Sequence, residues 1–118
     1  MLESIINKMG EYVPVYGESY DKILNLFASD VYFEPTTDLE LFYIGAYKYS
    51  RLDMKEAEEY FLKSAELGNS HAMYNLGFLC EHRKADNINA EEWYFKSAKL
   101  GNNKSYDLLR SSLIRRKD

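Results

Sequence analysis

Residues 57–69 read AEEYFLKSAELGN, and residues 90–102 read AEEWYFKSAKLGN. The two segments align without a gap at a shift of 33 residues. Further upstream, residues 44–45 (Ile-Gly) match residues 76–77 (Leu-Gly) at a shift of 32 residues. A period of this length is typical of helix–turn–helix units, which stack because a single unit cannot bury its apolar face alone. The sequence therefore predicts an all-α fold of stacked helix pairs.

Each unit contains two predicted helices, called here the A helix and the B helix. In the first unit, Thr37 and Glu40 form a capping-box pattern, in which each side chain bonds the backbone amide of the other residue. This pattern opens an A helix over residues 37–49. Asp53 has the same pattern with the glutamate three residues later, and it opens a B helix that Gly68 ends in the left-handed conformation.

The second unit repeats these boundaries. Ser70 is expected to cap an A helix that reaches about Cys80, and Asn89 is expected to open the B helix. A last helix can start at Asn102 or Asn103, since apolar residues recur after them at helical spacing. Small residues mark the contact within each pair, because they let two helix backbones approach closely. These residues are Gly45 and Gly77 on the A helices, and Ala57 and Ala90 on the B helices.

Residues 72–102 carry a longer pattern that runs across both helices of the second unit. The A helix contains Ala72 and Leu76-Gly77, and the B helix contains Ala90, Trp93-Tyr94, Lys96, Ala98 and Gly101. This pattern closely resembles the Sel1-like repeat, a relative of the tetratricopeptide repeat. Residues 40–69 resemble a second, weaker copy with Glu40, Ile44 and Tyr60 as substitutions. The glycine-rich segment usual between the two helices of that repeat is missing here, which brings these units nearer to tetratricopeptide length.

The resemblance implies an organisation for the whole chain. It implies a short right-handed α-solenoid of antiparallel helix pairs, in a single domain over residues 1–118. Residues 37–69 and 70–102 would be the two repeats, and residues 103–118 a C-terminal capping helix. Residues 1–36 would form a degenerate N-terminal helix pair or cap. Two apolar helical faces support that pair, one with Leu2, Ile5, Ile6 and Met9, the other with Tyr20, Ile23, Leu24 and Phe27.

In tetratricopeptide-type solenoids the A helices line a concave surface, and the resemblance implies the same surface here. The positions that it assigns to a groove for a partner are Leu39, Phe42, Ala46, Tyr49 and Ser50 in the first repeat, His71, Tyr74, Phe78, Glu81 and His82 in the second, and Lys104, Asp107, Ser111 and Arg115 in the last helix. Aromatic anchors mixed with charges are typical of recognition surfaces. The same spacing is typical of a core, so Phe42, Tyr74 and Phe78 could instead seal a narrow stack.

No segment of the sequence has the pattern of an active site or a metal site. There is no glycine-rich phosphate loop, zinc-binding pair or nucleophile elbow. His71 and His82 would lie about 16 Å apart on one helix, which is too far to share a metal ion. Cys80 is the only cysteine, and we expect it to be a small packed side chain. We therefore expect no catalytic residue, metal or cofactor.

Composition narrows the classes of partner and the location. The net charge of −4 argues against a general nucleic-acid binder, which needs a cationic face to neutralise phosphates. The charge changes from −6 over residues 1–40 to +3 over residues 81–118, which could orient a partner or a second copy. A lone cysteine, and the lack of a secretion signal or a membrane span, predict a cytosolic location. For a viral or intracellular bacterial source, this would be the host cytosol.

The leading functional hypothesis is a protein–protein interaction module. It would act as an adaptor or as a stand-alone inhibitor, and would bind another protein or peptide through the concave A-helix surface. The alternative is a structural protein that self-associates through the apolar faces of its terminal helices, so we expect a monomer or a weak homo-oligomer. An enzyme is the third possibility, which the missing site constellation disfavours. Neither nucleic acid nor a membrane is an expected partner.

Overall fold

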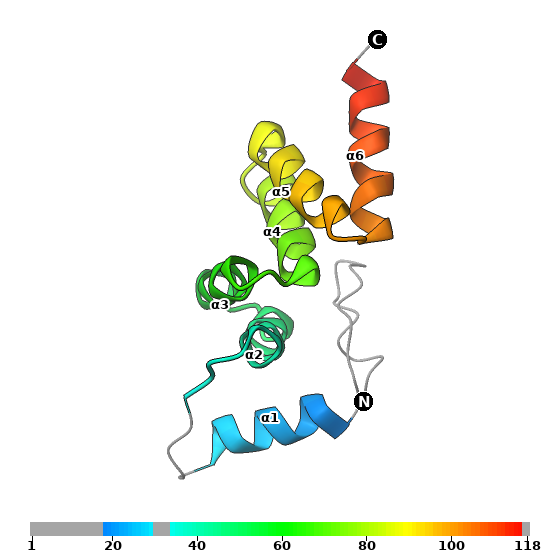
Figure 1. Ribbon diagram of the computed structural model, residues 1–118. Coiled ribbons are helices and arrows are strands. Elements are labelled where there is room, and N and C mark those ends of the chain that lie inside the picture. Colours follow the sequence, from blue (N-terminus) through cyan, green and yellow to red (C-terminus); the bar gives the residue numbers. More distant parts are fainter. Residues whose placement is uncertain (1–17, 30–33, 117–118) are drawn as a thin grey trace.

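The computed structural model describes residues 18–29 and 34–116 (Figure 1). Within these ranges the chain forms helices and no strand, which confirms the predicted all-α solenoid. The helices are α1 (Glu18–Ala28), α2 (Asp38–Ser50), α3 (Met54–Glu66), α4 (Ser70–His82), α5 (Asn87–Lys99) and α6 (Asn103–Arg116). The predicted apolar face with Leu2, Ile5, Ile6 and Met9 lies outside the described residues. The division of the domain at residues 36, 69 and 102 stays a prediction.

Each helix packs on the next one along the chain, and the closest pairs are α2 with α3 and α4 with α5. α3 also packs on α4, and α5 on α6, so the two pairs and α6 form one stack (Figure 1). α1 covers the free side of α2. Its buried Tyr20 meets the ring of Tyr43 edge-on, with centroids 5.6 Å apart. The second predicted face of residues 1–36 therefore packs into the core.

Hydrogen bonds at the helix starts confirm some predicted caps and correct others. The Thr37 hydroxyl accepts from the Glu40 amide at 3.1 Å, and the Glu40 carboxylate accepts from the Thr37 amide at 3.1 Å. The Glu40 carboxylate also accepts from the backbone amide of Thr36. This bond is the largest cause of the lowered pKa of Glu40, and the bonds with Thr37 add to it. The capping box predicted at Asp53 is wrong, because Asp53 forms no side-chain cap bond. The carboxylate of Glu56 instead pairs with Lys48 at 2.8 Å.

The starts of the last three helices follow from asparagine and aspartate side chains. Asn69, not the predicted Ser70, caps α4, since its side-chain oxygen accepts from the Ala72 amide at 2.9 Å. Asp86 caps α5, so this helix begins earlier than the predicted Asn89. Asn102 caps α6, as predicted. In each case the short polar side chain replaces a backbone acceptor that the first helical turn lacks.

Left-handed residues form the turns of the stack. Gly68 and Gly101 both have φ of +94°, which confirms them as the glycines that end α3 and α5. Leu52 and Ala85 have φ of +64° and +53° in the turns between the A and B helices. A side chain in this region costs about 1–2 kcal/mol. These short turns therefore store strain at positions where glycine would cost less.

Close contact between the A and B helices depends on a missing side chain. A Cβ atom added to Gly45 would lie 2.7 Å from the ring of Phe61, and one added to Gly77 would lie 2.5 Å from the ring of Tyr94. Both distances are shorter than van der Waals contact, so each aromatic ring fills the space that a glycine leaves. The predicted role of the two glycines is confirmed.

A serine hydrogen bond closes the other end of each pair. The Ser64 hydroxyl donates to the carbonyl oxygen of Asp38, and the Ser97 hydroxyl donates to that of Ser70, both at 2.7 Å. Both serines are fully buried. Because the two bonds occupy equivalent positions, each B helix has the same register against the start of its A helix.

α6 differs from the other A helices. Aligned by Leu109 with Leu76, it has Arg110 where α4 has Gly77. Leu108 and Leu109 pack against the core that α4 and α5 share. The outer side of α6 carries Arg110 and the exposed Tyr106, Leu113 and Ile114. A further B helix could not approach α6 as α5 approaches α4, because an arginine side chain occupies the contact position. The predicted role of α6 as a capping helix stays a prediction.

The Ala90→Leu substitution tests the register of the second pair. Ala90 is buried in a cluster with Tyr74, Cys80 and Tyr94. A larger side chain overpacks this cluster, so we expect urea denaturation to show a loss of about 1–3 kcal/mol in the free energy of unfolding. Glu92→Leu at an exposed position of the same helix is the control, and should change it by less than about 0.5 kcal/mol. An unchanged midpoint for Ala90→Leu would show that the register is wrong.

Asn75 is a position where a substitution should stabilise the folded protein. Its side chain is fully buried on α4, and neither amide atom has a hydrogen-bond partner among the described residues. An unsatisfied buried amide costs about 1–3 kcal/mol. We therefore expect Asn75→Leu, which keeps the branching at Cγ, to raise the melting temperature. A lower melting temperature for Asn75→Leu, together with a smaller loss for Asn75→Ser, would mean that the amide is satisfied.

Candidate functional site

Four of the predicted groove residues are buried in the core. Phe42 and Tyr49 are buried, with ring centroids 5.8 and 6.3 Å from that of Phe61. Tyr74 is buried against Tyr94, at a centroid distance of 6.1 Å. Ala46 is fully buried as well. The assignment of Phe42, Ala46 and Tyr49 to a groove is therefore wrong, because neighbouring helices cover α2 on several sides. α5 covers most of Tyr74, which still contributes to the lining of a pocket.

The remaining predicted residues lie at the surface, on two helices for the most part. On α4, His71, Phe78 and Glu81 are half-buried and His82 is exposed; on α6, Lys104, Asp107, Ser111 and Arg115 are exposed. Ser50 is half-buried, and its hydroxyl donates to the carbonyl oxygen of Tyr47. Leu39 is 39% exposed, but it lines a separate pocket between α1 and α2. We call the eight residues on α4 and α6 the α4–α6 surface.

Two contacts hold α4 and α6 side by side. At their N-terminal ends, Asn102 Nδ2 lies 3.3 Å from His71 Nδ1. Toward their C-terminal ends, Arg115 Nη2 lies 3.7 Å from Glu81 Oε2. Because residue numbers rise in the same direction along both contacts, the two helices run parallel, as two A helices of a solenoid should. The two contacts are about three helical turns apart along α4.

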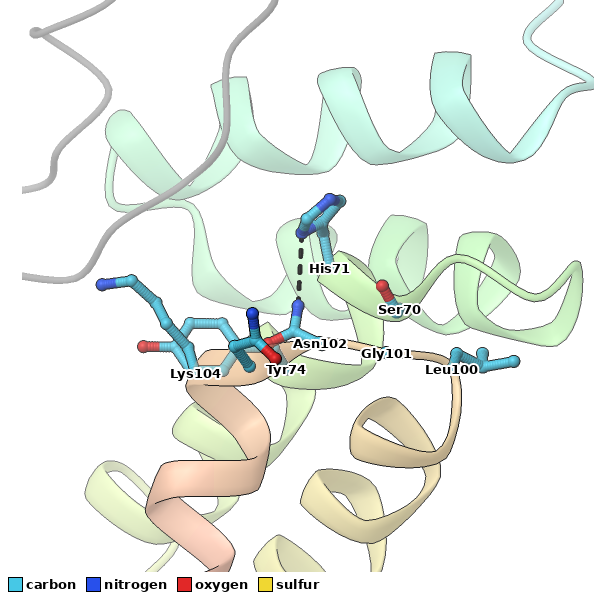
Figure 2. A pocket seen from close by; sticks show the side chains of 8 residues that line it. Ser70, His71, Tyr74, Leu100, Gly101, Asn102 and Lys104 are labelled. Carbon is cyan, nitrogen blue, oxygen red and sulfur yellow. Dashed lines mark hydrogen bonds between the residues drawn. The ribbon is translucent and has the colours of Figure 1, made fainter.

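A pocket of about 350 Å³ lies at the N-terminal end of the α4–α6 surface (Figure 2). It is lined by Ser70, His71, Tyr74, Leu100, Gly101, Asn102, Asn103 and Lys104. The pocket brings together three predicted residues, His71, Tyr74 and Lys104. Asn102 was predicted only as a possible start of the last helix, and Leu100 was not singled out. No sequence signal places these two beside His71, because the turn between α5 and α6 has to be folded back first.

His71 is held in its neutral form at the edge of this pocket. Burial lowers the pKa of the imidazole. The oxygen of the Asn102 side chain already accepts from the Ser105 amide, so its nitrogen faces His71 Nδ1 as a donor. An acceptor at Nδ1 leaves the ring proton on Nε2. The pocket thus presents a neutral imidazole, and the Lys104 side chain lines it from the start of α6 (Figure 2).

Glu81 is the centre of a polar cluster at the other end of the surface. Its carboxylate accepts a hydrogen bond of 2.8 Å from the Tyr94 hydroxyl. His82 Nε2 lies 3.5 Å from the same carboxylate, and the His82 ring lies 4.0 Å from that of Phe78, between centroids. The Glu81 side chain is therefore fixed by groups from α4, α5 and α6, whereas the His82 ring is exposed.

The described residues contain no group of three or more histidine, cysteine or acidic side chains that could hold a metal ion. Cys80 is buried, and burial raises the pKa of its thiol. A thiol whose pKa is raised is a poor nucleophile at neutral pH. Within the described ranges, no helix combines the length and the apolar character needed to cross a membrane.

Comparison with known protein families gives the same repeat units. The model of the Sel1 repeat family matches residues 40–69 and 70–102, which is more than half of the chain. This chain belongs to the Sel1 repeat family. Sel1 repeats are non-catalytic repeats that generally mediate protein–protein interaction. Neither the curated proteins nor the solved structures contain a match to this Sel1 repeat protein.

The lowered pKa of His71 predicts how stability depends on pH. The unfolded chain has the ordinary histidine pKa near 6.5 and therefore binds a proton more readily than the folded chain. The free energy of unfolding should then fall as the pH drops below about 6.5, whereas above it the ring is neutral in both states. We expect His71→Gln to make this fall shallower between pH 7 and 5.5 in urea titrations. His82→Gln, at the exposed histidine, is the matched control; equal slopes for both variants would contradict the assignment.

Proposed function

We propose that this Sel1 repeat protein binds a segment of a partner protein on the α4–α6 surface. The observation that carries the proposal is the pocket of about 350 Å³ between His71, Asn102 and Lys104. Binding pockets combine an apolar lining with a few fixed polar groups. Here Tyr74 and Leu100 supply apolar area, while the side chains of Lys104 and Asn102 supply donors.

The two ends of the surface suit different groups of a bound segment. Lys104 gives the pocket a positive charge, which favours a carboxylate or a carbonyl oxygen. Phe78 and His82 stack near the other end and offer an aromatic face. A segment with a polar anchor and an apolar residue about three turns apart would match both ends. The surface would therefore recognise a helix or an extended strand rather than a single side chain.

Two modes of action fit this surface, and we propose them without preference. As an adaptor, the protein would hold its partner beside a second protein. As a stand-alone inhibitor, it would cover a functional surface of the partner. Both modes need only the non-catalytic binding that is typical of Sel1 repeats, and both suit the cytosolic location predicted from the sequence. We expect no nucleic-acid partner, because the chain has a net charge of −4.

Self-association is the second candidate, and the outer side of α6 favours it in part. Tyr106, Leu113 and Ile114 are exposed there. Arg110 stands among them, however, where a close-packed B helix would need a glycine. We therefore expect a monomer or at most a weak homo-oligomer. Size-exclusion chromatography with light scattering, over a hundredfold range of concentration, tests this expectation.

The proposed binding is tested by affinity capture from a lysate of the source or its host, read by mass spectrometry. In the test variant, Lys104→Glu and Asp107→Lys exchange two exposed charges on the α4–α6 surface. We expect this variant to lose at least nine-tenths of a partner that the wild type retains. The fold should remain intact, since both side chains are exposed.

The control exchanges charges with the same spacing elsewhere. Lys63→Glu and Glu66→Lys alter exposed residues of α3 and leave the net charge unchanged. This control should capture the partner as well as the wild type does. Capture that survives the test variant would move the binding site to another face, and loss in both variants would show that the charge exchange acts through stability.

A further inference from the structure

A second crevice, of about 290 Å³, lies between the start of α3 and the end of α4. It is lined by Met54, Lys55, Glu58, Leu79, Arg83 and Lys84. None of these residues belongs to the α4–α6 surface, whose pocket lies at the opposite end of α4. The crevice spans the junction between the two repeats, because α3 closes the first unit and α4 opens the second.

The lining is cationic although the chain as a whole is acidic. Three of the six side chains are basic, and the single acid, Glu58, is already in an ion pair with Lys84. Lys55 and Arg83 are exposed and form no ion pair with another described residue. Two positive charges of the lining thus have no ion-pair partner among the described residues, in a protein of net charge −4.

Helix stability explains only part of this charge. Arg83 and Lys84 follow the end of α4, where the helix dipole favours cations. Lys55 lies in the first turn of α3, where the dipole disfavours a cation. The equivalent position of the second repeat, at a shift of 33 residues, has the uncharged Ile88. The helix dipole therefore does not favour a cation at Lys55, and the second repeat has none at the equivalent position.

The floor of the crevice is apolar. Leu79 is almost fully buried, and Met54 packs against the same core cluster. A bound group could therefore place an apolar side chain on Met54 and Leu79 while its charge meets Lys55 and Arg83. A ligand that carries an apolar group beside its charge would contact more of this lining than a free phosphate would.

We propose that the crevice between α3 and α4 binds an acidic segment of a partner protein, with a carboxylate at Lys55 and Arg83 and a neighbouring apolar side chain on Met54 and Leu79. The crevice would act as a second contact, independent of the α4–α6 surface. Two contacts on one short solenoid would raise the overall affinity for a partner that reaches both, through effective concentration.

Fluorescence anisotropy with defined peptides tests the proposal. The probe is a fluorescein-labelled decapeptide of alternating glutamate–leucine and glycine–serine pairs. Two comparison peptides replace its leucines by serine or its glutamates by lysine. We expect the glutamate–leucine probe to bind the full chain, the serine version to bind at least fivefold more weakly, and the lysine version not to bind. Binding of the probe should weaken as salt rises from 50 to 300 mM.

Variants assign the binding to the crevice. The double variant Lys55→Gln, Arg83→Gln should weaken binding of the probe at least tenfold. Lys63→Gln with Lys99→Gln removes the same charge from exposed positions on α3 and α5, and should change the affinity less than twofold. Lys104→Glu with Asp107→Lys should leave probe binding intact. This variant therefore separates a failure of the proposed binding at the α4–α6 surface from a failure of the proposed binding at the crevice. Equal loss in the two glutamine variants, equal binding of the serine peptide, or no binding at millimolar protein would each overturn the proposal.

Discussion

The close approach of an aromatic ring to a glycine is the contact on which the whole stack depends. Phe61 against Gly45 and Tyr94 against Gly77 leave no room for even one Cβ atom. This contact fixes the distance within each helix pair, and the buried serine bond at the other end fixes its register. Because both contacts recur in the second pair, the two pairs have the same internal spacing and register. The strained turns at Leu52 and Ala85 are tolerated because the helices on either side are held by these contacts.

The same contact connects the core to the candidate binding surface. Tyr94 packs its ring on Gly77 and extends its hydroxyl to Glu81, which in turn lies beside His82 and Arg115. One side chain of α5 therefore orients a polar cluster built from α4 and α6. A surface supported in this way is largely preorganised, so binding loses less conformational entropy than it would on mobile side chains. At the opposite end, the cap of α6 has a similar double role, since Asn102 both starts the helix and positions His71.

The fold could be predicted well from the sequence, and the surface only in part. The repeat, the glycines at positions 45 and 77 and the ends at Gly68 and Gly101 follow from local rules, so periodicity and turn chemistry suffice to find them. Phe42, Tyr49 and Tyr74 could not be assigned from spacing, because a stripe of aromatic residues has the same period in a core and in a groove. Whether such a residue lies in the core or in a groove depends on how closely α1, α3 and α5 cover the A helices. This coverage is a property of the tertiary structure. The cap predicted at Asp53 is wrong because its side chain forms no cap bond, and Glu56 pairs with Lys48 of the preceding helix.

Arg110 limits how such an array can change in length. Each internal A helix has a glycine at the position where its B helix packs, and α6 has Arg110 at the aligned position. A duplicated unit could therefore be inserted between α3 and α4, where both junctions already exist, but not directly after α6. Growth of this solenoid by repeat duplication would be directional, with the C-terminal helix carried along unchanged at the edge. A designer who wished to extend the stack beyond α6 would first have to restore glycine at position 110.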